Sequence, residues 1–194
     1  MAMGVGAGRP HHSRRDASAT KTVTNRTTLD RSAGVPPAPL PACLVATFLG
    51  VGHLRPGPGS WASAATVLLW WLLTRWLTPF WQPAAAFSLA VVAVAIGIPA
   101  ATRFARAMAH KDPQSVVIDE VAGQLITLIA APIAWQSLLL GFILFRGLDI
   151  VKPPPVRQLE RLPEGVGIVI DDVGAGLYGL GIMQMVLHFG LLST

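Results

Sequence analysis

The sequence predicts an all-α fold: a polytopic membrane helical bundle of about five to six helices. Of its 194 residues, 52% are hydrophobic and only 13% are charged, whereas roughly a quarter are charged in ordinary soluble domains. Four charge-free runs are close to or longer than the ~18 to 20 residues that a membrane helix needs: 56–74, 76–102, 121–145 and 173–194. An open sheet cannot lie in lipid, so these runs are predicted to be helical. The alternative is a soluble bundle of helices that are hydrophobic on all sides.

The first forty residues have a different composition from the rest. Residues 1–40 are rich in Ser, Thr, Gly, Ala and Pro and have no periodic apolar face, so we predict a disordered basic tail before a membrane-embedded domain over 41–194. Six Lys and Arg against two Asp give this tail +4 of the formal net charge of +5. Basic residues before the first apolar segment favour a cytoplasmic N-terminus. The tail lacks the aromatic residues and folded basic face typical of nucleic-acid binding.

Prolines, glycines and capping residues divide the apolar runs into expected helices. Ser60 is expected to be the N-cap of the helix that follows it. Pro132 and the prolines after Lys152 are expected to stop helices. The expected helices are 60–76, 84–98, 100–109, 117–132, 135–151 and 171–191. The segments VVID and VGIVID are also rich in β-branched residues, which leaves strands as the alternative there.

Acidic residues are few, and eight of the ten lie between Asp112 and Asp172. They include two adjacent pairs, Asp119–Glu120 and Asp171–Asp172, each expected to begin a helix. The helix macrodipole would favour such acids by a few tenths of a kcal/mol, which explains one carboxylate per helix better than two. Carboxylates at membrane depth are costly and usually functional. A divalent cation would hold several together, and oxygen-only ligands favour Mg²⁺, Mn²⁺ or Ca²⁺ over zinc.

Basic residues lie between the two acidic pairs, in the segment FRGLDIVKPPPVRQLERLPEGVG. Arg146 and Asp149 are three residues apart and share a helix face, and Lys152 and Arg157 follow. Such cations can form mere surface ion pairs, but beside a metal site they are predicted to bind phosphate.

The glycine-rich loop GVGHLRPGPGSWAS suits the same role. Its glycines allow close approach of the backbone to an anion, Arg55 adds a cation, and the following helix presents free N–H groups near Gly59 and Ser60.

Three blocks, in order, carry a resemblance to a known family: ATFLGVGHLRPGPGSWAS at 46–63, VVIDEVAGQLI at 116–126 and FRGLDIVKPPPVRQLERLPEGVGIVIDDVGAG at 145–176. The chain resembles the bacterial phosphatidylglycerophosphatase A family. The resemblance implies a magnesium-dependent, membrane-embedded phosphatase that converts phosphatidylglycerophosphate to phosphatidylglycerol and inorganic phosphate. It further implies a multi-pass protein of the bacterial cytoplasmic (inner) membrane with its active site facing the cytoplasm.

The resemblance also implies roles for individual residues. Lys152 would act in catalysis beside carboxylates that are both catalytic and metal-binding: Asp119, Glu120, Asp149, Asp171 and Asp172. Phosphate or substrate would be bound by Arg146, Arg157, Arg55, Gly59 and Ser60. The attacking group is left open between a water molecule and an aspartate that becomes phosphorylated.

The chain departs from the family pattern at four positions. Ser60 replaces the usual Thr and keeps the hydroxyl, and Ala62 stands where Gly is common. Glu160 replaces Asp, and Glu164 replaces the first of two glycines, which affects the expected shape of the loop before Gly165.

Two other functions were considered. A transporter or channel could use the acidic cluster as an ion relay, but it should carry acids along its charge-free helices rather than at their ends. A phosphotransferase that uses a CDP-alcohol needs a spaced Asp-Gly-x-x-Ala-Arg signature, which the sequence lacks.

Overall fold

The computed structural model describes residues 37–192, and every regular element in this part of the chain is helical. The prediction of an all-α fold is confirmed for these residues. The predicted basic tail lies almost wholly outside them. The α-helices are α1 (Leu40–Ala46), α2 (Pro58–Thr74), α3 (Gln82–Ala107), α4 (Ile118–Thr127), α5 (Trp135–Val151), α6 (Val156–Leu159) and α7 (Glu164–His188), with 3-10 helices η1 (Val51–His53) and η2 (Pro79–Trp81).

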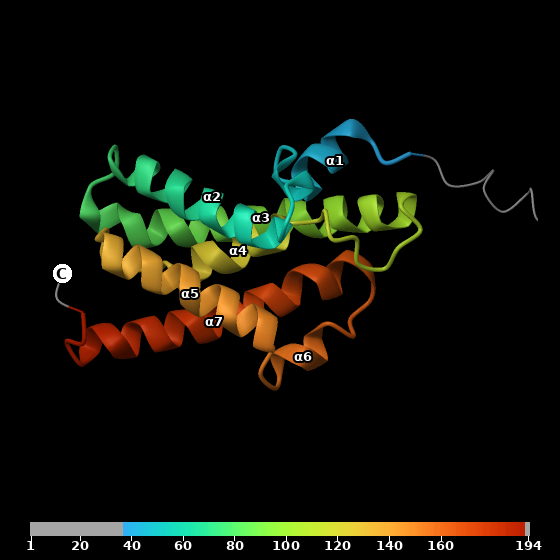
Figure 1. The fold of residues 1–194 in the computed structure, drawn as a ribbon. Coiled ribbons are helices and arrows are strands. Elements are labelled where there is room, and N and C mark those ends of the chain that lie inside the picture. Colours follow the sequence, from blue (N-terminus) through green and yellow to red (C-terminus); the bar gives the residue numbers. More distant parts are fainter. Residues whose placement is uncertain (1–36, 193–194) are drawn as a thin grey trace, which may run out of the picture. The chain divides into compact units, whose positions relative to one another are not determined.

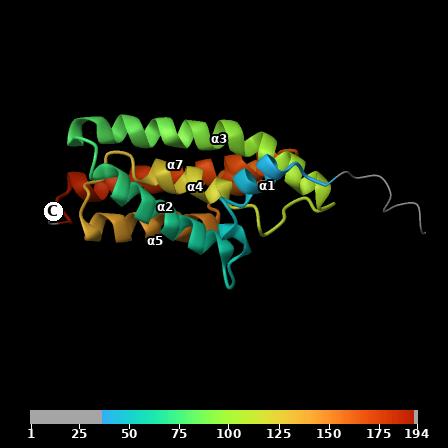
Figure 2. The same ribbon diagram turned by 90° about the horizontal axis from the view of Figure 1, so that it is seen from above.

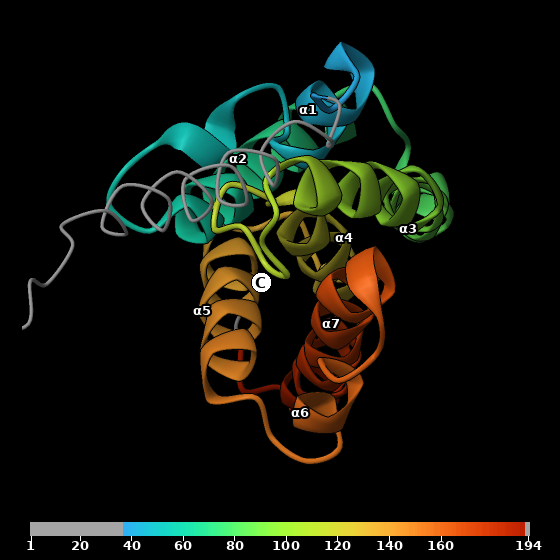
Figure 3. The ribbon, with the colours of Figure 1, turned by 90° about the vertical axis from the view of Figure 1, so that its right-hand side faces the viewer.

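Helix α4 is the centre of the bundle. The longer helices α2, α3, α5 and α7 run alongside one another (Figures 1 and 2), and the view along them in Figure 3 shows α4 between them. Helix α4 contacts all four, and each of its residues except Glu120 is buried. A helix that is covered on every side must be apolar or have its polar groups satisfied, so the acids of α4 require an explanation.

Glycines allow α4 and α7 to pack with their backbones nearly touching. A Cβ atom on Gly176 would lie 2.6 Å from the carbonyl oxygen of Gly123, and one on Gly123 would lie 2.6 Å from that of Asp172. The Thr127 hydroxyl, 3.0 Å from the Gly123 carbonyl oxygen and 3.3 Å from that of Gly176, donates across the same contact. This close approach brings the acidic part of α7 next to the acidic start of α4.

Helix α3 continues through Pro99, so the predicted division into two helices at this proline is wrong. Proline removes one backbone hydrogen bond from a helix, but packing of α3 against α4 and α7 compensates for the loss. Gly97 lies directly against Ile118 of α4, and the backbone N–H of Gly165 at the start of α7 donates to the Thr102 hydroxyl at 3.2 Å. These contacts hold α3 against its neighbours on both sides of Pro99.

Other helix boundaries also differ from the expected ones, although α5 matches its predicted range. Ser60 lies inside α2, whose N-cap is Gly57 with φ +66°, because Pro58 at the first helical position favours an earlier start. Helix α4 ends at Thr127, before Pro132. Helix α7 begins at Glu164 rather than Asp171. The segments VVID and VGIVID form no strand within the described residues.

The described residues contain more α-helices than the five to six expected, because α1 and α6 are short helices, of 7 and 4 residues, in segments for which the sequence predicts no helix.

Two helical segments are long and apolar enough to cross a membrane: Pro79–Ala107, with 29 residues, and Glu164–His188, with 25 residues. The outer surface of the bundle also carries many exposed large apolar side chains, among them Leu68, Trp71 and Phe87. Soluble monomers rarely expose large continuous apolar surfaces.

The glycine contact between α4 and α7 can be tested by comparing two glycines of the same helix. We expect Gly176→Ala to lower the free energy of unfolding by about 1–3 kcal/mol, because the added methyl group must push the two backbones apart. Gly181 has no neighbouring atom within 4 Å of an added Cβ, so Gly181→Ala should be neutral or stabilise α7 by up to about 1 kcal/mol. Thermal unfolding in detergent checks both. Equal effects of the two substitutions would contradict the tight contact.

Candidate active site

A cavity of about 540 Å³ lies at the end of the bundle where α2, α4 and α7 begin and α5 ends. Two loops border it, one before α2 and the other between α3 and α4. Every Asp and Glu among the described residues lines the cavity, together with four basic side chains: Asp112, Asp119, Glu120, Asp149, Glu160, Glu164, Asp171 and Asp172, with Arg55, Lys111, Arg146 and Lys152. Acids and bases that are far apart in the sequence therefore share one cavity.

Three carboxylates form a cluster at the base of this cavity. One oxygen from each of Asp119, Glu120 and Asp172 lies within 4.8 Å of the others. One oxygen on each residue, Asp119 Oδ1, Glu120 Oε2 and Asp172 Oδ2, is buried without a hydrogen-bond partner in the described part of the chain. Burial, followed by the negative charges of Glu120 and Asp172, raises the pKa of Asp119 well above its ordinary value, and burial likewise raises the pKa of Glu120.

Buried, unpartnered carboxylate oxygens are energetically unfavourable without a compensating charge. A metal ion would supply that charge, and a set of oxygen ligands drawn from carboxylates is the kind that hard divalent cations prefer. The residues present therefore fit a metal ion.

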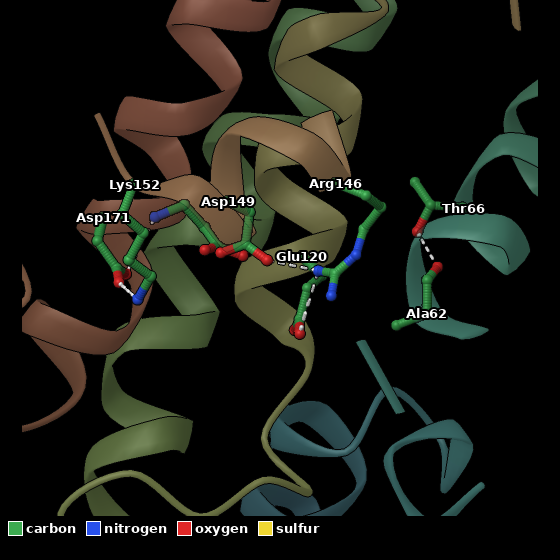
Figure 4. A network of polar contacts seen from close by, with 8 residues as sticks. Ala62, Thr66, Glu120, Arg146, Asp149, Lys152 and Asp171 are labelled. Carbon is green, nitrogen blue, oxygen red and sulfur yellow. Dashed lines mark hydrogen bonds and ion pairs between the residues drawn. The ribbon is translucent and has the colours of Figure 1, made fainter. Parts of the chain in front are cut away.

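Two further carboxylates are paired with cations beside the cluster (Figure 4). Arg146 Nη1 lies 2.6 Å from Asp149 Oδ2 and 3.8 Å from Glu120 Oε1. Lys152 Nζ lies 2.6 Å from Asp171 Oδ2 and 3.6 Å from the more exposed Glu160. The five acids predicted as metal ligands are thus arranged as a cluster of three and two ion-paired neighbours.

The ammonium group of Lys152 is held in its charged form. Partial burial would lower the pKa of Lys152, but the hydrogen bond that its ammonium group donates to Asp171 and the charges of Asp171, Glu160 and Asp149 outweigh burial and raise this pKa above its ordinary value. The backbone explains how Lys152 reaches α7. Residues 153–155 are prolines that end α5, and Lys152 caps the helix in the left-handed conformation, with its N–H donating to the Leu148 carbonyl oxygen at 2.8 Å.

Asp171 and Asp172 do not begin a helix, contrary to the prediction. They lie two turns inside α7, where the macrodipole no longer stabilises charge, since its effect falls off within the first turn. Helix capping therefore does not explain this pair. Asp119 and Glu120 do lie in the first turn of α4, as expected, but both are largely buried.

The structure brings only part of the predicted phosphate-binding set to the cavity. Gly59 lies at the start of α2 against Glu120, and a Cβ there would lie 3.1 Å from Arg146 Nη1. Arg55 lines the cavity, and its Nη1 donates to Gln114 Oε1 at 3.1 Å. Ser60 and Arg157 do not line the cavity, and Arg157 is exposed on α6.

Three lining residues were not singled out from the sequence: Lys111, Asp112 and Gln114. They form the loop before α4, and the signal that could have identified them is the charged Lys-Asp pair just ahead of VVIDE. The proximity of this Lys-Asp pair to Arg55 depends on packing between the loop before α2 and the loop before α4. The Val117 N–H donates to the Ala46 carbonyl oxygen at 2.8 Å, which ties the end of the loop before α4 to the last residue of α1.

Glu164, one of the departures from the family pattern, has φ +54°, a conformation that glycine adopts without steric cost. Its carboxylate forms a two-oxygen ion pair with Arg106, with Nη2 at 2.6 and 2.7 Å. The glutamate thus occupies a backbone conformation suited to the glycine it replaces, and it joins the ends of α3 and α7.

Buried carboxylates beside basic side chains that are held by ion pairs are the groups that metal-assisted phosphate chemistry uses. The fold and the site therefore define an apolar helical bundle equipped for this chemistry.

Comparison with known proteins identifies the family. A model of the family described as phosphatidylglycerophosphatase A matches residues 44–187. The chain is 38% identical over 156 residues to phosphatidylglycerophosphatase A of Escherichia coli (strain K12), an alignment that covers 77% of this chain and 87% of that protein. It is 34% identical over 153 residues to phosphatidylglycerophosphatase A of Haemophilus influenzae, covering 78% and 91%.

A Bacteroides thetaiotaomicron protein provisionally named a phosphatidylinositol-3-phosphatase is 38% identical over 142 residues, covering 70% of this chain and 86% of that protein. No solved structure matches the chain. The chain belongs to the phosphatidylglycerophosphatase A family, a family of phosphatase enzymes. The resemblance noted from the sequence is confirmed.

The carboxylate cluster predicts opposite effects of one substitution with and without metal. In chelator, Asp172→Asn should unfold at the same or a higher temperature than the parent, because it removes a buried charge that lacks a partner. With metal, the parent should be stabilised, and Asp172→Asn should bind Mn²⁺ at least about tenfold more weakly. Electron paramagnetic resonance of Mn²⁺ and thermal unfolding measure the two quantities. Parental Mn²⁺ affinity in a folded Asp172→Asn variant would contradict the metal site.

Proposed function

We propose that this protein is a magnesium-dependent, membrane-embedded phosphatase that removes the terminal phosphomonoester of phosphatidylglycerophosphate, giving phosphatidylglycerol and inorganic phosphate. The observation that carries the proposal is the cluster of Asp119, Glu120 and Asp172, whose unpartnered oxygens lie in the same cavity as Arg146 and Lys152. Family membership supports the reaction class, and the names of two relatives support the substrate.

Magnesium would be held by Asp119, Glu120 and Asp172, while Asp149 and Asp171, the other two predicted ligands, are held beside the cluster by their ion pairs with Arg146 and Lys152. Bound Mg²⁺ would supply Lewis-acid polarisation of the phosphoryl oxygens. A ligand set made only of carboxylates suits Mg²⁺ better than zinc, which usually takes nitrogen and sulfur ligands.

The two cations would neutralise the charge that develops on the phosphoryl oxygens. The side chains of Arg146 and Lys152 are 15% and 26% exposed, so both are open to the cavity yet shielded from bulk water, where such interactions are weakened. Their ion pairs with Asp149 and Asp171 hold them in place before the substrate arrives. Preorganisation of this kind avoids reorganisation during the reaction.

Hydrolysis breaks the bond between phosphorus and the glycerol oxygen and forms one between phosphorus and an oxygen from water, while a proton from that water ends on the released glycerol hydroxyl. The attacking group is either water itself or an aspartate carboxylate of the cavity, whose phosphoryl ester water then cleaves. Both routes use the same cations.

The distribution of charge supports a membrane protein with its site at the cytoplasmic surface. Among the described residues, eight of the nine Lys and Arg belong to segments at the end of the bundle that holds the cavity, namely the loop before α2, the last two turns of α3, the loop before α4, the end of α5, α6 and the loop before α7, whereas Arg75 follows the opposite end of α2. The eight are Arg55, Arg103, Arg106, Lys111, Arg146, Lys152, Arg157 and Arg161. Basic residues accumulate on the cytoplasmic side of bacterial membrane proteins, which favours the inner membrane with several helices spanning it.

The same distribution does not favour a transporter or channel. Every Asp and Glu between residues 37 and 192 belongs to the end of the bundle that holds the cavity, so the described residues provide no chain of acids through the apolar half. An ion relay needs ionisable groups along its path.

The function is tested by phosphate release from phosphatidylglycerophosphate in detergent micelles. We expect turnover with Mg²⁺, none with chelator, and a loss of at least about 10²-fold in Asp119→Asn and Asp172→Asn, the scale expected for removing a positioned electrostatic group. Lys152→Ala should lower turnover without changing the Mg²⁺ concentration that is required, because its proposed partner is the phosphate.

Glu164→Gln is the matched control, since Glu164 is an acid of the same cavity paired with the exposed Arg106. It should stay within about threefold of the parent, because exposed ion pairs contribute little. Phosphatidylinositol 3-phosphate serves as the competing substrate. Preferential hydrolysis of that lipid, or parental turnover by folded Asp119→Asn and Asp172→Asn variants, would refute the proposed substrate or the proposed site.

A further inference from the structure

Two basic residues of the cavity have no acidic partner among residues 37–192. In the described part of the chain, Arg146, Lys152 and Arg106 all form ion pairs with carboxylates. Arg55 and Lys111, which line the cavity opening, form none. Because a cation without a partner beside a substrate cavity can attract a second anionic group, the opening differs from the base of the cavity in what it can bind.

The opening is built by two loops that hold each other in place. Arg55 belongs to the loop before α2 and Lys111 to the loop before α4, and Arg55 Nη1 donates to Gln114 Oε1 at 3.1 Å. The backbones of these loops also meet, since a Cβ on Gly52 would lie 2.9 Å from the carbonyl carbon of Ser115. The guanidinium of Arg55 is therefore oriented by a neutral partner that leaves its charge available.

The proposed substrate carries two phosphate groups of different kinds. Its terminal phosphate is a monoester, and its internal phosphate is a diester one glycerol unit away. The carboxylate cluster with Arg146 and Lys152 accounts for the monoester, but nothing in that cluster accounts for the diester, whose charge persists in the product.

We propose that Arg55 and Lys111, with Gln114 as the residue that positions Arg55, form a second anion subsite that binds the internal phosphodiester of the lipid headgroup. The inference rests on the proposed function and adds a specificity determinant to it. Such a subsite would distinguish a headgroup with two phosphates from a lipid that carries a single phosphomonoester. Asp112 lines the same opening and opposes the two cations, so it limits the affinity for the diester and for the product that retains it.

The subsite is tested by comparing substrates and inhibitors on the full-length chain. In Arg55→Gln and Lys111→Gln, the KM for phosphatidylglycerophosphate should rise about fivefold each with kcat within about twofold, a change expected for a binding contact made equally in ground and transition states. The kcat/KM for phosphatidic acid, which lacks the diester, should stay within about twofold.

Two soluble inhibitors separate the subsites without relying on either lipid. Glycerophosphoglycerol carries only a diester and should inhibit the parent, but inhibit Arg55→Gln and Lys111→Gln about fivefold more weakly. Inorganic phosphate, which probes the carboxylate end, should inhibit all of them equally. Asp112→Asn should shift glycerophosphoglycerol inhibition in the opposite direction, towards tighter binding.

Arg103→Gln is the matched control for general attraction to anionic micelles. Arg103 is an exposed cation near the same end of the bundle, hydrogen-bonded to the Pro99 carbonyl oxygen and outside the cavity. The Arg103→Gln variant should change neither the kinetic constants for the two lipids nor the inhibition by glycerophosphoglycerol and phosphate. Equal weakening of phosphate and glycerophosphoglycerol inhibition, or no change in either, would overturn the second subsite. Failure of the parent to hydrolyse phosphatidylglycerophosphate would instead refute the proposed function.

Discussion

The close approach of α4 and α7 is the contact on which the rest of the site depends. Gly123 and Gly176 let the two backbones meet without side chains between them, and Thr127 adds a hydrogen bond across the contact. Only at this separation can Asp172 of α7 reach Asp119 and Glu120 of α4. Because α4 also contacts α2, α3 and α5, the position of one short helix sets the position of every carboxylate in the cluster.

Burying acids in an apolar bundle imposes an electrostatic constraint that the neighbouring residues partly meet. Asp149 and Asp171 each face a cation at 2.6 Å, so they need no further charge. One oxygen each of Asp119, Glu120 and Asp172 has no hydrogen-bond partner among residues 37–192, and the mutual repulsion of these carboxylates favours a bound cation. The same arrangement that destabilises the bundle without metal would therefore preorganise it for metal binding.

Charge and apolar surface are separated along the bundle. Within residues 37–192, one end carries the cavity and nearly all of the ionisable residues, and the remaining surface exposes large apolar side chains such as Leu68 and Trp71. This division suits a substrate that is itself divided, with a charged headgroup at the membrane surface and acyl chains in lipid. Asp172 lies eight residues from the start of α7, or ~12 Å along the helix, which keeps the cluster near one end of the bundle.

The sequence alone determined the helical class, because charge-free runs of this length leave few other folds, and it determined the family through the motifs around Asp119, Asp149 and Asp172. It also identified the start of α4 and the full extent of α5. Tertiary structure decided what depends on contacts between distant segments. Packing against α4 and α7 keeps α3 helical through Pro99, and the extension of α7 back to Glu164 removes Asp171 from a helix start. The two loops bring Lys111 beside Arg55 across more than fifty residues. Local pattern predicts which residues carry charge, but only packing decides which charges meet.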